Sequence, residues 1–124
     1  IACWSGNDDE AHDARHTYKA HGVISVTSNL IPGLFRQLID TKNEELNNSL
    51  QPLMNWLFCE PNPIAINTAL MMTGAVKPVF RMPYTPLSSA QQIEGKTLIN
   101  QLSEQDIVGR FAENLDIDTV LVLS

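Results

Sequence analysis

The apolar positions of the chain form two short continuous runs, followed by longer stripes at helical spacing. The short runs are residues 1–5 and 22–27, and such runs of apolar and β-branched residues are typical of buried strands. Residues 10–20 between them contain no helix breaker, and Asp8 and Asp9 precede this segment as candidate helix caps. Strand, helix and strand in so few residues predict a βα crossover between parallel strands.

Amphipathic helices are predicted next. Apolar residues recur every three or four positions over residues 30–39 and again over residues 46–58. Pro52 removes one backbone donor from the second of these helices, which is expected to continue because both of its halves are apolar on one face. Asn62 is a candidate cap for a third helix over residues 63–73.

Glycine, proline and serine positions divide the rest of the chain. Gly74 is expected to end the third helix as its C-cap. Prolines exclude a helix over residues 75–87 and predict an extended connection there. Ser88 or Ser89 can then cap a last helix that runs to about residue 102, and Gly95 is expected to weaken that helix.

Two parallel strands followed by helices would leave strand edges unpaired, and such edges need neighbouring strands. A strand that ends in a polar turn, followed by helix, strand and helix, fits the last two βα units of a (β/α)8 TIM barrel, which requires about 250 residues. We therefore predict an α/β fold in which residues 1–43 end a barrel, residues 44–103 form a C-terminal helical region and residues 104–124 form a tail. Residues 120–123 have strand propensity but no obvious partner.

Because the sequence opens with Ile1 inside an expected strand, we expect the chain to be a fragment of a longer protein. Taken alone, it is expected to be poorly folded, because its strands would expose edges and its helices would lose the barrel on which they pack.

Composition limits the classes of function. A chain of 124 residues with 44% hydrophobic residues can form a small core. The net charge of −6 and the scattered basic residues argue against nucleic acid or an anionic membrane as a partner, and no apolar run approaches the ~20 residues that span a bilayer. Cys3 and Cys59 lie far apart, which favours buried thiols in a reducing compartment over a disulfide between them.

Four segments resemble signatures of the dihydrodipicolinate synthase family: WSGNDDE at 4–10, GVISVTSN at 22–29, EPNPI at 60–64 and FRMPYTPL at 80–87. Their order and spacing over residues 1–102 identify the chain as a member of that family. The GNDDE form, the WLFC run at 56–59 and the presence of a tail resemble the plant and algal enzymes.

The resemblance implies a class I aldolase-type lyase of lysine biosynthesis through diaminopimelate. In that family a lysine on the sixth barrel strand forms a Schiff base with pyruvate, and the enamine attacks L-aspartate 4-semialdehyde to give 4-hydroxy-tetrahydrodipicolinate after cyclisation. The resemblance further implies a homotetramer, a chloroplast location for a plant or algal member and a cytoplasmic one otherwise, with no cofactor and no metal.

The catalytic residues are expected outside this chain. Catalytic groups of a barrel project from strand ends. The four lysines instead fall on predicted helices or linkers: Lys19, Lys42, Lys77 and Lys96. The resemblance places the Schiff-base lysine and the proton-relay tyrosine upstream of Ile1, so Tyr18 and Tyr84 inherit no catalytic role. The fragment alone is therefore expected to be inactive.

Two substrate-binding positions are expected within the chain. By resemblance, Ile24 offers its main-chain carbonyl to bound pyruvate, and Gly6 lets the backbone approach the pocket without a side chain in the way. The competing interpretations are that Ile24 only fills the barrel core and that Gly6 only relieves strain at a strand-to-helix turn.

Other polar residues are interpreted structurally. Asp8 and Asp9 are expected to cap a helix rather than to act in catalysis. His12 and His16 lie four residues apart on a predicted helix, but no Glu-containing zinc motif accompanies them, so no metal site is predicted. The turn at 62–64 is expected to be a packed helix junction with a secondary role in shaping the pocket.

Two rival functions remain open. A sister enzyme, such as an N-acetylneuraminate lyase or a keto-deoxy-sugar aldolase, would share the barrel, the pyruvate and the Schiff base, although residues 60–64 and 80–87 favour the synthase. The other rival is a non-catalytic remnant that scaffolds or regulates intact subunits.

Overall fold

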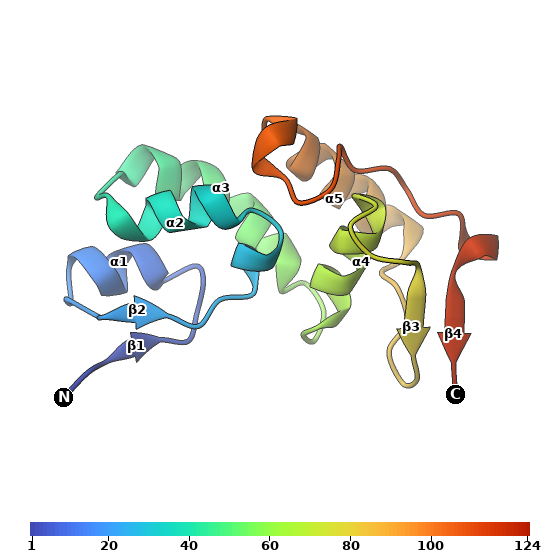
Figure 1. The fold of residues 1–124 in the computed structure, drawn as a ribbon, viewed down its shortest axis with the longest axis horizontal. Helices are drawn as coiled ribbons and strands as arrows, with labels where there is room; N and C mark the ends of the chain where they lie inside the picture. Colours follow the sequence, from blue (N-terminus) through green and yellow to red (C-terminus); the bar gives the residue numbers. More distant parts are fainter.

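The computed structural model describes all 124 residues as an elongated molecule with a pair of short strands at each end and helices between them (Figure 1). Its α-helices and strands follow in the order β1 (Trp4–Ser5), α1 (Ala11–His16), β2 (Gly22–Val23), α2 (Pro32–Asp40), α3 (Glu44–Leu57), α4 (Ile64–Met72), β3 (Val79–Arg81), α5 (Ser89–Asn100) and β4 (Leu121–Leu123). Three single turns of 3-10 helix are η1 (Thr27–Asn29), η2 (Glu104–Asp106) and η3 (Ile117–Thr119).

The predicted parallel crossover is confirmed, because β1 pairs with β2 in parallel and α1 connects them. The prediction that both strands are buried is wrong for this chain. Trp4 is 61% exposed and Ile24 is 74% exposed, because α1 covers only one face of the two-stranded sheet and no element covers the other. Cys3 and Cys59 are also exposed free thiols rather than buried ones.

The two predicted amphipathic helices are confirmed as α2 and α3. Phe35 and Leu38 of α2 are buried, whereas Arg36 and Asp40 form an exposed ion pair on its outer side. Helix α3 continues through Pro52 as expected, and the Asn43 side chain caps it by accepting a hydrogen bond from the Leu46 N–H at 3.0 Å.

Helix α4 begins at Ile64, so the prediction that Asn62 caps it is wrong. Asn62 stands two residues before the first helical residue, and the cap position is occupied by Pro63, which makes no side-chain cap. At the other end of α4, Gly74 has a φ of 73°, in the left-handed region that a C-cap glycine adopts. The expected extended connection follows and contains β3.

Helix α5 begins with a capping box. The Ser88 hydroxyl accepts from the Gln91 N–H, and the Gln91 side chain accepts from the Ser88 N–H in return. Gly95 does more than weaken this helix, since a Cβ at this position would overlap the Trp56 ring. The helix therefore lies directly against α3.

The C-terminal strand has a partner that the sequence pattern did not reveal. Strand β4 pairs in parallel with β3, with Phe80 opposite Val122. The Leu121 N–H donates to the Pro78 carbonyl at 2.9 Å, and the Met82 N–H donates to the Leu123 carbonyl. The pairing joins residues some 40 positions apart, so no local signal announces it.

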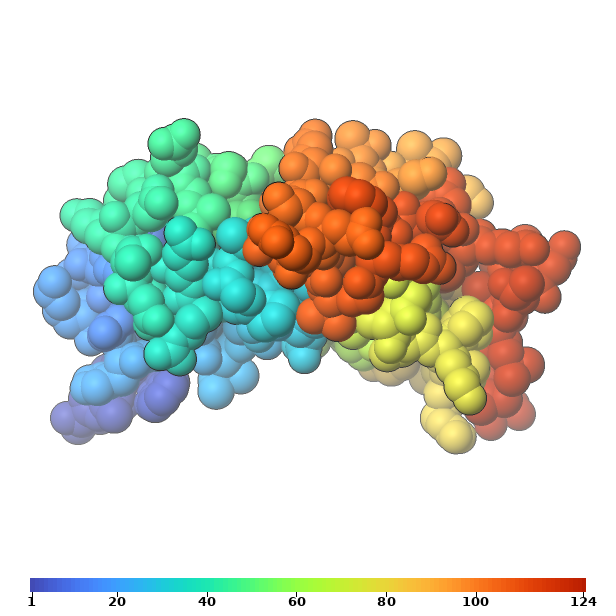
Figure 2. Space-filling model, turned by 45° about the horizontal axis from the view of Figure 1, so that its top comes forward, coloured from blue at the N-terminus to red at the C-terminus, as the bar shows by residue number.

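One hydrophobic core runs through the three predicted segments. Its 18 buried residues include Ala11 and Leu38 from the first, Met54 and Ile99 from the second, and Ala112 from the third. The segment after α5 also contacts the first segment just before α2, since the Val108 N–H donates to the Leu30 carbonyl at 2.9 Å (Figure 2). None of the helices is long and apolar enough to cross a membrane.

Candidate functional site

The carboxyl ends of β1 and β2 lie side by side. The parallel register pairs Ser5 with Val23, and the Ile24 N–H donates to the Ser5 carbonyl at 2.9 Å. The next residues along the two strands are Gly6 and Ile24, so the two positions expected to bind substrate are neighbours at one edge of the sheet. In α/β barrels, binding and catalytic groups gather at this edge.

The face of the sheet that carries Trp4 and Ile24 is uncovered. Side chains two residues apart along a strand share a face. Val23 points to the opposite face and packs against the hydrophobic core. A Cβ added at Gly6 would meet no atom within 4 Å. The Gly6 and Ile24 backbones therefore border open space.

The Ile24 carbonyl oxygen accepts no hydrogen bond from any group in the chain. A carbonyl can only accept, so this oxygen suits a ligand that presents a donor, such as a hydroxyl or the N–H of a protonated imine. The competing interpretation of Gly6 as a strain-relieving residue gains no support, because the only glycines with positive φ are Gly74 and Gly109.

Neither Asp8 nor Asp9 caps α1, which corrects the sequence-based expectation. Helix α1 starts after Glu10 and has no side-chain cap. Instead, Asp8 Oδ2 accepts three hydrogen bonds from the segment after β2: from the Val26 N–H at 3.1 Å, the Thr27 N–H at 2.7 Å and the Thr27 hydroxyl at 2.7 Å. Asp8 is only 2% exposed and Thr27 is fully buried. The carboxylate thus joins the two strand ends.

Sequence reasoning missed this role of Asp8 because its partners are 18 and 19 residues away. A polar turn after a strand is equally typical of a helix cap, and nothing local distinguishes the two. The only available signal was that two parallel strand ends must meet.

The turn after β1 also faces α3. The Gln51 side chain donates to the Asp9 carbonyl at 3.0 Å. A hollow of about 380 Å³ lies beside this contact and is lined by Asn7, Asp8, Asp9, Met54, Asn55 and Phe58. Helix α3 therefore covers one side of the turn that follows β1.

His12 and His16 form a structural contact. The buried His12 accepts from the Asn43 N–H through Nε2 at 3.1 Å, so this nitrogen carries no proton. The two imidazole rings are 4.6 Å apart, and burial first and the nearby His16 second lower the pKa of His12. No group of three or more His, Cys, Asp or Glu side chains in the structure could hold a metal ion.

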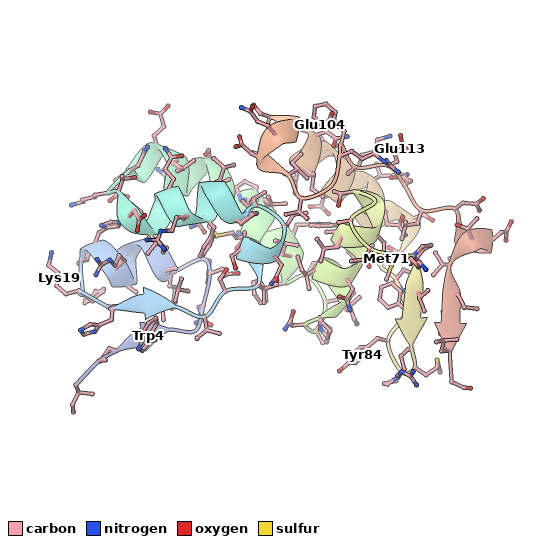
Figure 3. All side chains as sticks on the ribbon, viewed as in Figure 1. Trp4, Lys19, Met71, Tyr84, Glu104 and Glu113 are labelled. Atoms are coloured by element: carbon pink, nitrogen blue, oxygen red, sulfur yellow. The ribbon has the colours of Figure 1, made fainter.

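The lysines and tyrosines lie away from the edge that carries Gly6 and Ile24. Lys19 precedes β2 and lies at the opposite end of that strand (Figure 3). Tyr84 follows β3 at the far end of the molecule, and Tyr18 is a 76% exposed residue just after α1. Lys42 precedes α3, Lys77 precedes β3 and Lys96 lies within α5.

Comparison with known proteins gives consistent matches. The model of the dihydrodipicolinate synthetase family matches residues 1–102. The chloroplastic 4-hydroxy-tetrahydrodipicolinate synthase of Nicotiana tabacum is 54% identical over 110 residues, which cover 88% of this chain and 31% of that protein. Synthase 1 of Arabidopsis thaliana, also chloroplastic, is 50% identical over 125 residues, which cover 99% of this chain and 34% of that protein.

The matches among solved structures are also dihydrodipicolinate synthases. The chloride-inhibited dihydrodipicolinate synthase of Acinetobacter baumannii, complexed with pyruvate, superposes with a TM-score of 0.72 at 33% identity, over 81% of this chain and 36% of that one. The Thermotoga maritima synthase gives a TM-score of 0.71 at 31% identity, over 81% and 36%. The chain thus spans about a third of the length of these relatives, whose fold is the TIM barrel. It belongs to the dihydrodipicolinate synthetase family.

Proposed function

We propose that the chain is the C-terminal third of a 4-hydroxy-tetrahydrodipicolinate synthase. In this proposal residues 1–43 are the last two βα units of the barrel, residues 44–103 are the helical region and residues 104–124 are the tail. The match over residues 1–102 and the parallel order of β1, α1 and β2 support it. The curated plant relatives are named chloroplastic, which supports a plastid location.

The proposed reaction is the Schiff-base condensation of pyruvate with L-aspartate 4-semialdehyde. A lysine from the upstream part of the barrel would form the imine. Residues of this chain would form part of the pocket wall, with Ile24 offering its main-chain carbonyl to the bound pyruvate and Gly6 leaving the pocket free of a side chain. The proposal includes assembly of the full-length enzyme as a homotetramer.

The match of the family model over residues 1–102 carries this proposal, and the two strand ends add a second observation. The Ile24 carbonyl stands without a hydrogen-bond donor at the carboxyl end of β2, directly beside a glycine that borders open space. A free acceptor at the catalytic edge of a barrel suits the N–H of a protonated imine, and a missing side chain leaves room for a small ligand.

The first test is to sequence the transcript upstream of the Ile1 codon. A frame that continues through six βα units, with a lysine at the end of the strand two before β2, is the expected result. The full-length protein should then condense pyruvate with L-aspartate 4-semialdehyde and should not cleave N-acetylneuraminate. Borohydride should trap pyruvate on the upstream lysine. Translation that begins at Ile1 would instead favour the non-catalytic remnant.

Gly6→Ala in the full-length protein tests the site itself. Because a Cβ at this position meets no atom of this chain within 4 Å and would project into the proposed pocket, we expect unchanged folding but a KM for pyruvate raised by about tenfold. Gly33→Ala is the matched control, since a Cβ at Gly33 on α2 also meets no atom and lies outside the proposed pocket. An unchanged KM in Gly6→Ala would remove Gly6 from the pocket.

A further inference from the structure

We propose that Asp8 is a positioning residue, whose buried carboxylate fixes the turn after β2 and thereby aims the Ile24 carbonyl at the bound pyruvate. This inference rests on the proposed function and assigns to Asp8 a role distinct from that of the groups that touch substrate.

The hydrogen bonds of Asp8 are concentrated on that turn. All three hydrogen bonds that its carboxylate accepts reach Oδ2 and come from Val26 and Thr27, two and three residues after Ile24. Oδ1 is buried and accepts none in this chain. Two of these hydrogen bonds are short, at 2.7 Å from the N–H and the hydroxyl of Thr27.

Val26 packs against the hydrophobic core and Thr27 is buried, but few hydrogen bonds tie the turn to the end of β1. Within the turn, the Ser28 N–H donates to the Ser25 hydroxyl at 3.0 Å and the Ser28 hydroxyl donates to the Ser25 carbonyl at 3.3 Å. These bonds shape the turn but do not tie it to β1. The link to the neighbouring strand end comes from the Ile24 N–H on the Ser5 carbonyl and from Asp8.

The two links act on either side of the Ile24 carbonyl. The bond between Ile24 and Ser5 holds the peptide before it, and Asp8 holds the amides of Val26 and Thr27 after it. The orientation of the Ile24 carbonyl depends on the peptide plane between Ile24 and Ser25, which lies between the two anchors. Without Asp8, only the packing of Val26 and Thr27 holds the chain after that plane, so the plane can shift.

Three variants of the full-length protein should raise the KM for pyruvate to increasing degrees. Thr27→Val removes one donor, Asp8→Asn keeps the shape but loses the charge, and Asp8→Ala removes the acceptor. We expect the KM for pyruvate to rise in that order, reaching about tenfold to a hundredfold in Asp8→Ala, because misplacement of a contact by about 1 Å can cost that much. The KM for pyruvate of Asp8→Asn should therefore lie between those of wild type and Asp8→Ala.

A matched control distinguishes the positioning role of Asp8 from a purely structural role. Ser88→Ala removes the cap of α5, far from β1 and β2, and should lower the melting temperature without changing the KM for pyruvate. At an equal loss of melting temperature, the Asp8 variants should raise KM and Ser88→Ala should not. If the Asp8 variants lose only melting temperature, Asp8 is structural and the inference fails.

The hydrogen-exchange rates of the Val26 and Thr27 amides provide a second measurement, which needs no substrate. Asp8→Ala should speed exchange at both amides, whereas Ser88→Ala should not. Faster exchange with an unchanged KM would overturn the positioning role and leave the proposed function intact. A wild-type protein that does not condense pyruvate with the semialdehyde would overturn the proposed function itself, and the positioning role with it.

Discussion

At the residue scale, Gly95 illustrates how packing changes the meaning of a sequence signal. The sequence predicted that this glycine weakens the last helix, and its low helix propensity justifies that expectation. The structure adds that the position admits no side chain, because the Trp56 ring occupies the space. Trp56 cannot easily yield, since its indole N–H donates to the Gln91 carbonyl at 2.8 Å. Propensity is local, but this contact joins residues 39 positions apart.

Gly95→Ala should therefore destabilise the protein although alanine is the better helix former. We expect a loss of about 1–3 kcal/mol in the free energy of unfolding, typical of overpacking. Chemical denaturation of the full-length protein measures it. Gly33→Ala, at a helical position with open space, should be neutral or stabilising by up to about 1 kcal/mol. Stabilisation by both substitutions would contradict the close contact with Trp56.

His12 gives a pH-dependent prediction at the same scale. Its pKa in the folded protein is lowered from the ordinary 6.5, chiefly by burial and next by His16, although Glu44 and Asp13 oppose this shift. The unfolded chain therefore binds the proton more readily. The stabilising contribution of neutral His12 is complete above pH 6.5 and is lost as the pH falls through 6.5 and then through the lowered pKa.

His12→Gln should flatten the pH dependence of stability, because the glutamine carbonyl can accept from the Asn43 N–H without titrating. Unfolding midpoints of wild type and variant between about pH 7.5 and pH 5.5 measure the difference. His21→Gln is the control, since His21 also accepts a backbone N–H, from Cys3, but at an exposed site. An equal flattening in both variants would assign the effect to histidine in general.

At the element scale, local patterns predicted the helices well and the strand contacts poorly. Helices α2, α3 and α5 follow from apolar spacing and from the Ser88 cap, all of which lie within a few residues of each other. Strand β4 was expected only as a propensity, since its partner β3 lies beyond α5. The link from Asp8 to Thr27 was missed for the same reason.

The β3–β4 pair allows a prediction about the tail. Leu121→Pro removes the N–H that donates to the Pro78 carbonyl, so the amides of β3 and Met82 should exchange faster with solvent. Because side chains and amides alternate along a strand, the Val122 N–H points away from β3, and Val122→Pro is the matched control. The loss of free energy should be small, since all three β4 residues are exposed. Equal exchange in both variants would refute the parallel register.

At the scale of the whole molecule, the sequence predicted the two strand ends that build the site but not what holds them. The register confirmed that Gly6 and Ile24 are neighbours, whereas their contact with pyruvate stays a prediction. The expectation of buried strands depended on neighbours that these 124 residues do not provide. A continuous apolar run predicts burial but carries no information on which segment covers it.

The uncovered face gives the last prediction, which tests the barrel as a whole. If residues 1–43 complete a barrel, the Trp4 side chain, 61% exposed in this chain, should be buried by the rest of the full-length protein. Hydroxyl-radical footprinting read by mass spectrometry should then find Trp4 about as protected as the buried Trp56. The exposed Phe111 within the tail provides a comparison outside the barrel and should remain reactive. A Trp4 that reacts readily in the folded, full-length protein would mean that β1 and β2 are not covered on that face. The barrel placement of residues 1–43 would then be wrong even if the family assignment stands.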